Sequence, residues 1–171
     1  MTRTLAHTDS RALLAQGIKS GDQLEKGYLF NRAIEVLVEA HGENVIIPTY
    51  NYDFPESKIF DLELTPSDLG FLSNQAIRVP AWLREPTPVF SHAMRGHQLP
   101  LSQTPFGAGS FFESLLEDNS RISFWGVGLE RMTFIHFVED QASIPYRYKK
   151  SFAGSLKSGL LASDVEVQFH V

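Results

Sequence analysis

The residues best suited to chemistry are a histidine and a glutamate in the segment Thr-Phe-Ile-His-Phe-Val-Glu, residues 133–139. His136 and Glu139 are three positions apart, so on a helix they share one face. A carboxylate there can orient the imidazole and favour its protonated form, which suits a general base. Spacing alone favours a packed core histidine beside a solvated glutamate. His-x-x-Glu by itself offers few metal ligands, and we predict no metal site.

A second candidate is the turn Pro-Phe-Gly-Ala-Gly-Ser at residues 105–110, which leads into a predicted helix. Gly107 and Gly109 would free backbone amides to cradle a phosphate at the helix N-terminus, beside the hydroxyl of Ser110. A plain turn with Ser110 as the N-cap is at least as consistent with this sequence. The segment matches neither a Walker loop nor a dinucleotide fingerprint.

A third candidate is the aromatic segment at residues 48–54, directly after a predicted strand. Hydroxyl, amide and aromatic groups at a strand end can line a ligand cleft, and an aromatic loop packed on the domain edge is the alternative. Ser91 and His92 are adjacent on a predicted strand, so they point to opposite faces and cannot form a dyad with each other. Four further histidines are interpreted as surface or packing residues: His7, His41, His97 and His170.

These candidates need elements to position them. Apolar residues at helical spacing over 30–38 predict a helix that ends near Gly42, and the β-branched run 44–48 predicts a buried strand. This alternation indicates an α/β fold. Further helices are predicted at 12–18, at 65–77 with Thr65 as cap and Pro66 in the first turn, at 110–116 and at 132–139. Further strands are predicted at 88–94, 121–125 and 165–171, and residues 51–65 are predicted to form an irregular loop.

Composition limits the class of protein. The 171 residues suffice for one domain with a sizeable core, and the absence of cysteine excludes disulfides and thiolate chemistry. The net charge of −5, without a dense Lys/Arg run, argues against a nucleic-acid partner. No segment approaches the roughly 20 apolar residues of a membrane span, and residues 1–10 lack the apolar core of a signal peptide. We therefore expect a cytoplasmic protein whose negative charge would attract a cationic substrate or simply maintain solubility.

Several stretches share residue types and spacing with a known family. They are residues 46–54, Phe60-Asp61, Thr65-Pro66-Ser67 with Gly70, Arg84 with Pro88 and Ser91, residues 105–110, Gly126-Val127-Gly128, Thr133 with His136 and Glu139, and residues 145–148. In this order, over residues 42–154, they resemble the aminoglycoside 3-N-acetyltransferase family, particularly its members associated with polysaccharide aminosugars.

The resemblance implies a three-layer α/β/α sandwich around a mixed sheet, with an extended C-terminal β segment. It implies that the protein binds acetyl-CoA as co-substrate and transfers acetyl to an amine. His136 would then remove the proton of the attacking amine, Glu139 would orient the imidazole, and Thr133 would lie close to the thioester. An ammonium is not nucleophilic, so a base with a pKa near neutrality is what the reaction requires. The resemblance thus reverses the preference for a core histidine at position 136.

The same resemblance assigns the ligand contacts. Cofactor binding would fall to Thr49, Tyr50, Gly107, Gly109 and Ser110, and substrate binding to Asn51, Tyr52, Asp53 and Asp61. The acceptor would be a small amine: an aminosugar, free or nucleotide-linked, or an aminoglycoside. A second copy of the chain could cover an open sheet edge, which would make a homodimer.

Three departures from the family pattern stand out. The family has a strand with a His-Ser-Ser/Asp-Leu type signature before the helix that precedes Pro48, and Gly21-Asp22 runs on without one. Residues 84–91 lack both histidines of the antibiotic enzymes' Arg-Ser-x-His-Pro-x-His-Ser, which favours an aminosugar acceptor. Asn74 stands where many relatives have glutamate.

We therefore expect one domain over residues 1–171, incomplete relative to the family, with a strand missing near 22–27 and an early end after 171. Two alternatives to the acetyltransferase remain open. One is a CoA- or sugar-binding relative without turnover. The other is a thioester hydrolase, which would need Ser91 or Ser110 within roughly 3 Å of His136.

Overall fold

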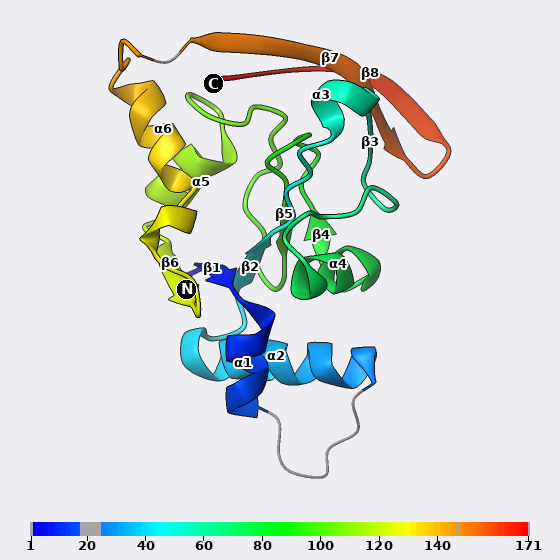
Figure 1. The fold of residues 1–171 in the computed structure, drawn as a ribbon, viewed down its shortest axis with the longest axis vertical. Coiled ribbons are helices and arrows are strands. Elements are labelled where there is room, and N and C mark those ends of the chain that lie inside the picture. Colours follow the sequence, from blue (N-terminus) through cyan, green and yellow to red (C-terminus); the bar gives the residue numbers. More distant parts are fainter. Residues whose placement is uncertain (1, 18–24, 147, 171) are drawn as a thin grey trace.

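The computed structural model describes residues 2–17, 25–146 and 148–170, and a five-stranded sheet lies at its centre (Figure 1). The strands are β1 (Thr4–Thr8), β2 (Val45–Pro48), β4 (Leu83–Arg84), β5 (His92–Met94) and β6 (Arg121–Trp125), in the order β4-β5-β2-β1-β6. β1 runs parallel to both β2 and β6, whereas β5 is antiparallel to β2 and β4. The sheet is therefore mixed, as predicted.

Both faces of this sheet are buried under helices. Along β2, Ile47 packs into one core with α1 (Ser10–Gly17), α2 (Lys26–His41) and α4 (Phe71–Arg78). Ile46 faces the other way and packs with α5 (Phe111–Glu117) and α6 (Phe134–Gln141). Because successive strand side chains alternate, one strand supplies both cores. This arrangement confirms the three-layer α/β/α sandwich.

The C-terminal segment forms a long hairpin across the top of the molecule (Figure 1). β7 (Lys149–Ser158) pairs antiparallel with β8 (Leu161–His170), and β3 (Ile59–Asp61) joins β7 in parallel. At Gly154 a Cβ would lie 2.5 Å from the carbonyl oxygen of Lys58, so only glycine lets β7 approach α3 (Phe54–Ser57) this closely. The extended C-terminal β segment is thus confirmed.

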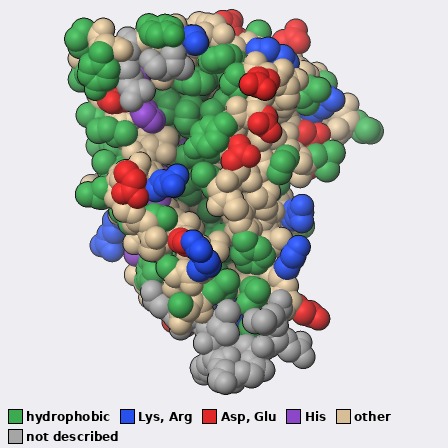
Figure 2. All heavy atoms as spheres, in the orientation of Figure 1, with side chains coloured by type: hydrophobic (Ala, Val, Ile, Leu, Met, Phe, Trp, Pro, Cys, Tyr) green, Lys and Arg blue, Asp and Glu red, His purple; other side chains and the backbone are tan. Residues whose placement is uncertain are grey.

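The hairpin is also tied to the helix that carries His136. The Asp140 carboxylate on α6 lies 3.2 Å from Lys149 Nζ and 3.1 Å from His170 Nδ1, one residue from each hairpin strand. On the face seen in Figure 2, hydrophobic side chains are exposed in its upper part, where α6 and the hairpin lie. Within the described residues, every helix is too short or too polar to cross a membrane.

Three local predictions were wrong. The helix predicted from Thr65 begins instead at Phe71, after Gly70 at φ 94°. Thr65 cannot cap it, because its hydroxyl accepts the amide hydrogen of Asp61 at 2.7 Å and closes the turn that follows β3. The strand predicted over 88–94 shrinks to three residues because Val89 has a φ of 71°, outside the extended region. The loop predicted over 51–65 contains α3 and β3.

The first residues of the chain form a central strand that sequence analysis did not predict. β1 lies between β2 and β6, and its Leu5 and Ala6 are fully buried. A strand was expected to be missing near 22–27; of these residues 22–24 lie outside the described residues, and Lys26 already begins α2. The position beside β2 is filled by β1, whose last residues are His7 and Thr8; like the His-Ser-Ser/Asp-Leu signature, this end has a histidine followed by a hydroxyl residue.

Candidate active site

A cleft of about 670 Å³ opens where three strands of the central sheet end. β1, β2 and β6 are parallel, so their carboxyl ends meet at one edge, the usual place for sites in open α/β sheets. Each strand sends its following residues into the wall of the cleft. The lining comprises residues 7–11, Pro48, Tyr50, Tyr52, residues 68–71, Ser73, Val127, residues 130–133, Ile135 and His136.

His136 is the third residue of α6 and lines the cleft from the first turn of that helix. The chain leaves β6 through Gly126, at φ 68°, where a Cβ would lie 2.3 Å from the Cβ of Ala12. Glycine is required here for both its conformation and its lack of a side chain. The tight exit brings Gly126 against Ala12 of α1, and Val127 and Thr133 beyond it line the cleft. The start of α6 is thereby held beside the ends of β1 and β2.

The imidazole of His136 is paired with a carboxylate. His136 Nδ1 lies 2.8 Å from Glu139 Oε2, and the two side chains are 31% and 14% exposed. With the carboxylate on Nδ1, the neutral ring carries its proton there and Nε2 is left as the proton acceptor. The edge of the ring also contacts Phe106, at 5.6 Å between centroids. The predicted helical geometry of this pair is confirmed.

The turn between β1 and α1 supplies a part of the cleft that sequence analysis missed. Asp9 Oδ1 accepts the amide hydrogen of Arg11 at 2.8 Å and so caps α1, while its other oxygen pairs with the Arg11 guanidinium at 2.8 Å. His7 is 5% exposed and stacks on Phe124. Burial lowers the pKa of His7 to about 4, and within the described residues its Nε2 has no hydrogen-bond partner. The His-Thr-Asp-Ser run after a short apolar strand was the available signal.

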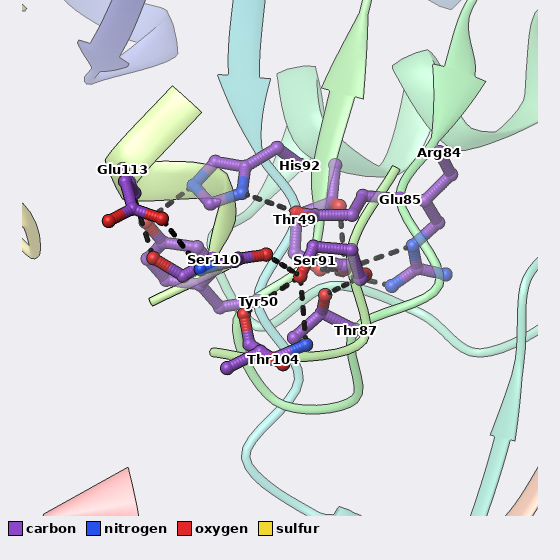
Figure 3. Close-up of polar contacts among 12 residues, drawn as sticks. Thr49, Tyr50, Arg84, Glu85, Thr87, Ser91, His92, Thr104, Ser110 and Glu113 are labelled. Carbon is purple, nitrogen blue, oxygen red and sulfur yellow. Dashed lines mark hydrogen bonds and ion pairs between the residues drawn. The ribbon is translucent and has the colours of Figure 1, made fainter. Parts of the chain in front are cut away.

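Beside the cleft, two buried polar clusters occupy opposite faces of the β4-β5-β2 region (Figure 3). In the first, Arg84 Nε donates to Ser91 Oγ at 3.1 Å and its Nη2 donates to the carbonyl of Thr49 at 3.0 Å. The guanidinium also lies over the ring of Phe60, and burial lowers the pKa of Arg84 to about 10. This arginine satisfies backbone carbonyls and joins the central sheet to β3.

The second cluster lies on the neighbouring positions of the same three segments. His92 Nδ1 is 2.9 Å from Glu85 Oε2, and His92 Nε2 is 3.0 Å from the hydroxyl of Tyr50 (Figure 3). Both His92 and Glu85 are fully buried. The His92 ring stacks on Phe111 at 4.1 Å between centroids. Tyr50 lines the cleft, so this buried cluster reaches the candidate site.

The structure brings together only some of the predicted site residues. Tyr50, Tyr52, Thr133 and His136 line the cleft, and Glu139 contacts His136. Three predicted substrate contacts line a separate hollow of about 420 Å³ near β3: Asn51, Asp53 and Asp61. Thr49 is fully buried and its hydroxyl lies 2.9 Å from that of Ser91, away from the cleft lining.

The glycine turn also lies outside the cleft lining. The Gly109 amide donates to Glu113 Oε2 at 2.6 Å, and the Ser110 hydroxyl accepts from the Glu113 amide at 3.2 Å. The Ser110 amide donates to the carbonyl of Gly107 at 3.2 Å. The amides of Gly109 and Ser110 are thus used inside the turn, and Ser110 is the N-cap of α5, which was the alternative interpretation. Cofactor binding by Gly107, Gly109 and Ser110 stays a prediction.

The two serines that a hydrolase would need are engaged elsewhere. Ser91 Oγ contacts Thr49 and Arg84, and Ser110 Oγ caps α5. The His136 ring is hydrogen-bonded to Glu139 through Nδ1. Among the described residues, neither of these two serines is therefore paired with His136, as a thioester hydrolase would require.

The fold and this site define an α/β/α protein with a histidine–glutamate pair at the carboxyl ends of its parallel strands. The family model of the aminoglycoside 3-N-acetyltransferases matches residues 38–166, three quarters of the chain. The chain therefore belongs to the aminoglycoside 3-N-acetyltransferase family, as its motifs suggested. A sequence search of curated proteins found no match.

Solved structures share the whole of this fold. The apoenzyme of aminoglycoside acetyltransferase AAC(3)-IVa is 23% identical, with a TM-score of 0.68 over 98% of this chain and 63% of its own. The AAC-IIIb complex with CoASH is 17% identical, with a TM-score of 0.74 over 99% and 69%. YokD from Bacillus subtilis is 16% identical, with a TM-score of 0.73 over 99% and 75%. The chain thus spans 63% of the length of AAC(3)-IVa, and the likeness establishes the fold.

Proposed function

We propose that this chain is an acetyl-CoA-dependent N-acetyltransferase in which His136 is the general base and the acceptor is an amine of an aminoglycoside or a related aminosugar. The observation that carries the proposal is the His136–Glu139 pair, at 2.8 Å, in the wall of a cleft at the carboxyl ends of β1, β2 and β6. In a member of this family, a paired imidazole at such an edge is placed for amine deprotonation.

In this reaction His136 Nε2 accepts the proton that the attacking amine loses. The amine nitrogen forms a bond to the thioester carbonyl carbon while the carbon–sulfur bond breaks, and the amine loses a proton to Nε2, directly or through water. That proton then becomes available to the departing thiolate. The Glu139 carboxylate stabilises the imidazolium formed on the way, because an opposite charge within hydrogen-bond distance favours the protonated ring.

The acetyl donor would occupy the same cleft. Bound acetyl-CoA would supply the activated acetyl group. The cleft volume of about 670 Å³ suits a ligand of this class, and Arg11 and Arg131 contribute cationic groups to its wall. Thr133 lines the wall three residues before His136, and its hydroxyl does not cap α6, which leaves it for contacts at the thioester. AAC-IIIb, which shares the fold, is described with CoASH.

The acceptor class follows from the relatives and from two departures of this sequence. AAC-VIa, which also shares the fold, is described with bound sisomicin. In this chain Thr87 and Phe90 replace the two histidines of the antibiotic enzymes' signature. Phe90 packs its ring on Phe106 and Tyr50 instead. Because both histidines of that signature are replaced, one of them by the apolar Phe90, we favour an aminosugar as the acceptor over the antibiotics. The aminosugar could be free or nucleotide-linked.

The proposal is tested by measuring thiol release from acetyl-CoA with a panel of aminoglycosides and aminosugars. We expect turnover with at least one amine and a loss of about 10²–10⁴-fold in kcat for His136→Ala. His97→Ala is the matched control, because His97 is exposed and outside the cleft lining, and it should keep full activity. Full activity in His136→Ala would refute the base. Calorimetric binding of CoA or a sugar without transfer would favour the non-catalytic relative.

A further inference from the structure

One wall of the cleft carries an exposed tyrosine that the proposed proton transfer does not use. Tyr52 lines the cleft and is 52% exposed, whereas Tyr50, two residues earlier in the same loop, is buried. A ring left half in solvent contributes less to the core than a buried one, and it offers a flat apolar surface to a ligand. Tyr52 is therefore a candidate contact for the acceptor.

Tyr52 belongs to a row of rings that begins at the proposed base. The ring of His136 contacts that of Phe106 at 5.6 Å between centroids. Phe106 contacts Phe90 at 4.8 Å, and Phe90 contacts Tyr52 edge-on at 6.4 Å. Phe90 stands in place of a histidine of the antibiotic enzymes' signature, so this departure from the signature also supports the exposed tyrosine. Two intervening rings thus connect Tyr52 to His136 along the cleft.

The position of Tyr52 is fixed through Asp68. The backbone amide of Tyr52 donates to Asp68 Oδ2 at 2.7 Å, and the backbone amide of Asp68 donates to the carbonyl of Tyr50 at 2.9 Å. The hydroxyl of Ser67 donates to the same carbonyl at 3.1 Å. These contacts hold Tyr52 and Asp68 next to each other before any ligand binds, and such preorganisation lowers the entropic cost of binding.

Asp68 places a negative charge beside this ring. Its side chain is exposed in the cleft lining, and among the described residues its carboxylate has no hydrogen bond or ion pair besides the Tyr52 amide. Asp9, another carboxylate of the lining, is already paired with Arg11 at 2.8 Å. Burial raises the pKa of Tyr52, the nearby charge of Asp68 raises it further, and Arg131, one of the cations assigned above to the acetyl donor, lowers it. A charge without a partner in the described chain and an exposed ring therefore adjoin in the cleft wall.

This combination suits a sugar that carries more than one amine. The carbon–hydrogen face of a sugar ring can pack on the ring of Tyr52, and a protonated amine is attracted both by a carboxylate and by the face of an aromatic ring. The amine that reacts at His136 must be neutral, because an ammonium is not nucleophilic. The cation bound at Asp68 is then a second amine of the same sugar.

We propose that Tyr52 and Asp68 form the acceptor subsite of the cleft, where the sugar ring packs on Tyr52 and Asp68 holds a second, protonated amine, so that the preferred acceptor is a diamino sugar. The remaining amine is then presented to His136. Both residues contact the substrate and take no part in proton transfer. The preference in acetylation rests on the proposed function, whereas the binding of the sugar can be measured without turnover.

The binding test is a titration of 2,6-diamino-2,6-dideoxyglucose into the protein in the presence of CoASH, with dissociation constants read from backbone amide NMR shifts. Asp68→Asn keeps an oxygen that accepts the Tyr52 amide hydrogen but removes the charge, and it should raise Kd about tenfold. Asp164→Asn, exposed on β8 outside the cleft lining, makes the same change of charge and should leave Kd unchanged. No binding to the wild type, an unchanged Kd in Asp68→Asn, or equal effects of both variants would overturn the subsite.

The ring is tested in the same titration. Tyr52→Leu removes the aromatic face and should raise Kd for the diamino sugar about three- to fivefold. Tyr52→Phe is the matched variant, because it keeps the ring, and it should bind within about twofold of the wild type. Equal affinities of the leucine and phenylalanine variants would contradict a role for the ring.

Kinetics separate this subsite from the proposed function. With the wild type we expect kcat/KM to be about tenfold higher for the diamino sugar than for glucosamine, because glucosamine cannot occupy Asp68 and react at His136 at once. Asp68→Asn should abolish this preference. Acetylation of both sugars at equal kcat/KM in the wild type would refute the subsite and leave the proposed function standing. Binding with the expected dependence on Asp68 but without any thiol release would refute the proposed function and leave the subsite standing.

Discussion

Two histidine–glutamate pairs of almost equal length lie in this molecule in opposite surroundings. His136 Nδ1 is 2.8 Å from Glu139, with both side chains partly exposed at the cleft, and His92 Nδ1 is 2.9 Å from Glu85, with both fully buried. Water can support a charged imidazolium–carboxylate pair at the first position but not at the second. The contact distance alone therefore does not distinguish the two pairs, whereas their burial does.

The strongest test of this contrast is to remove each histidine in turn. His92→Leu leaves Glu85 and Tyr50 buried without their partner, so we expect a loss of about 2–4 kcal/mol in the free energy of unfolding. His136→Leu should change that free energy by less than about 1 kcal/mol, because its side chain is partly solvated. Urea unfolding of both variants gives the comparison. Similar losses in the two variants would break the contrast.

A third histidine, His7, shows the effect of burial on a histidine that is not part of a histidine–glutamate pair. His7 is buried, its Nε2 has no hydrogen-bond partner in the part of the chain that the structure describes, and its pKa of about 4 lies below the unfolded value near 6.5. As the pH falls from 6.5 to 4, the unfolded chain binds this proton and the folded chain does not, so stability is lost, by up to about 3 kcal/mol. His7→Gln should remove that part of the acid destabilisation. Unfolding measured at pH 7 and pH 4.5 checks this, and an unchanged pH dependence would contradict it.

The exposed pair is tested at its carboxylate. Glu139→Gln keeps a hydrogen-bond acceptor near His136 Nδ1 but removes the charge that stabilises the imidazolium, so kcat/KM should fall about tenfold. Glu117→Gln, at the exposed end of α5, is the control and should leave kcat/KM unchanged. An undiminished rate in Glu139→Gln would mean that the pair orients the ring without an electrostatic contribution.

The smallest expected effect concerns the buried acid. Because the pKa of Glu85 is raised in the folded chain, keeping it protonated costs stability increasingly as the pH rises above its unfolded value. Glutamine carries no such cost. The stability of Glu85→Gln relative to the wild type should therefore increase from pH 4.5 to pH 7.5 in urea unfolding. A constant difference would indicate that Glu85 is ionised when buried.

Patterns local in the sequence predicted much of this molecule. The helical repeat from Phe30 to Val38 predicted α2, the run before Pro48 predicted β2, and the spacing of His136 and Glu139 predicted a pair that forms within one turn of α6. These features depend on neighbours a few residues away. The capping role of Ser110, weighed as an alternative, is local in the same way.

Features that depend on distant partners were not predictable. Glu85 meets His92 because β4 and β5 are antiparallel, a register fixed by the sheet. The five residues of β1 contain two apolar side chains, Leu5 and Ala6, and give no strong strand signal alone. They become a central strand because β2 and β6 pair with them on either side. His7 was predicted to be a surface or packing residue; it packs on Phe124 and also lines the cleft.

The place of β1 has a consequence for how the chain assembles. Its partners follow it in the sequence, and Thr4 pairs with both Val45 and Arg121. During synthesis from the N-terminus, the second neighbour is made only when most of the chain has emerged. Until then the nascent sheet exposes an edge on β1 that can pair with another polypeptide. Such long-range closure slows folding, so the segment that builds one wall of the cleft is among the last to be fully paired.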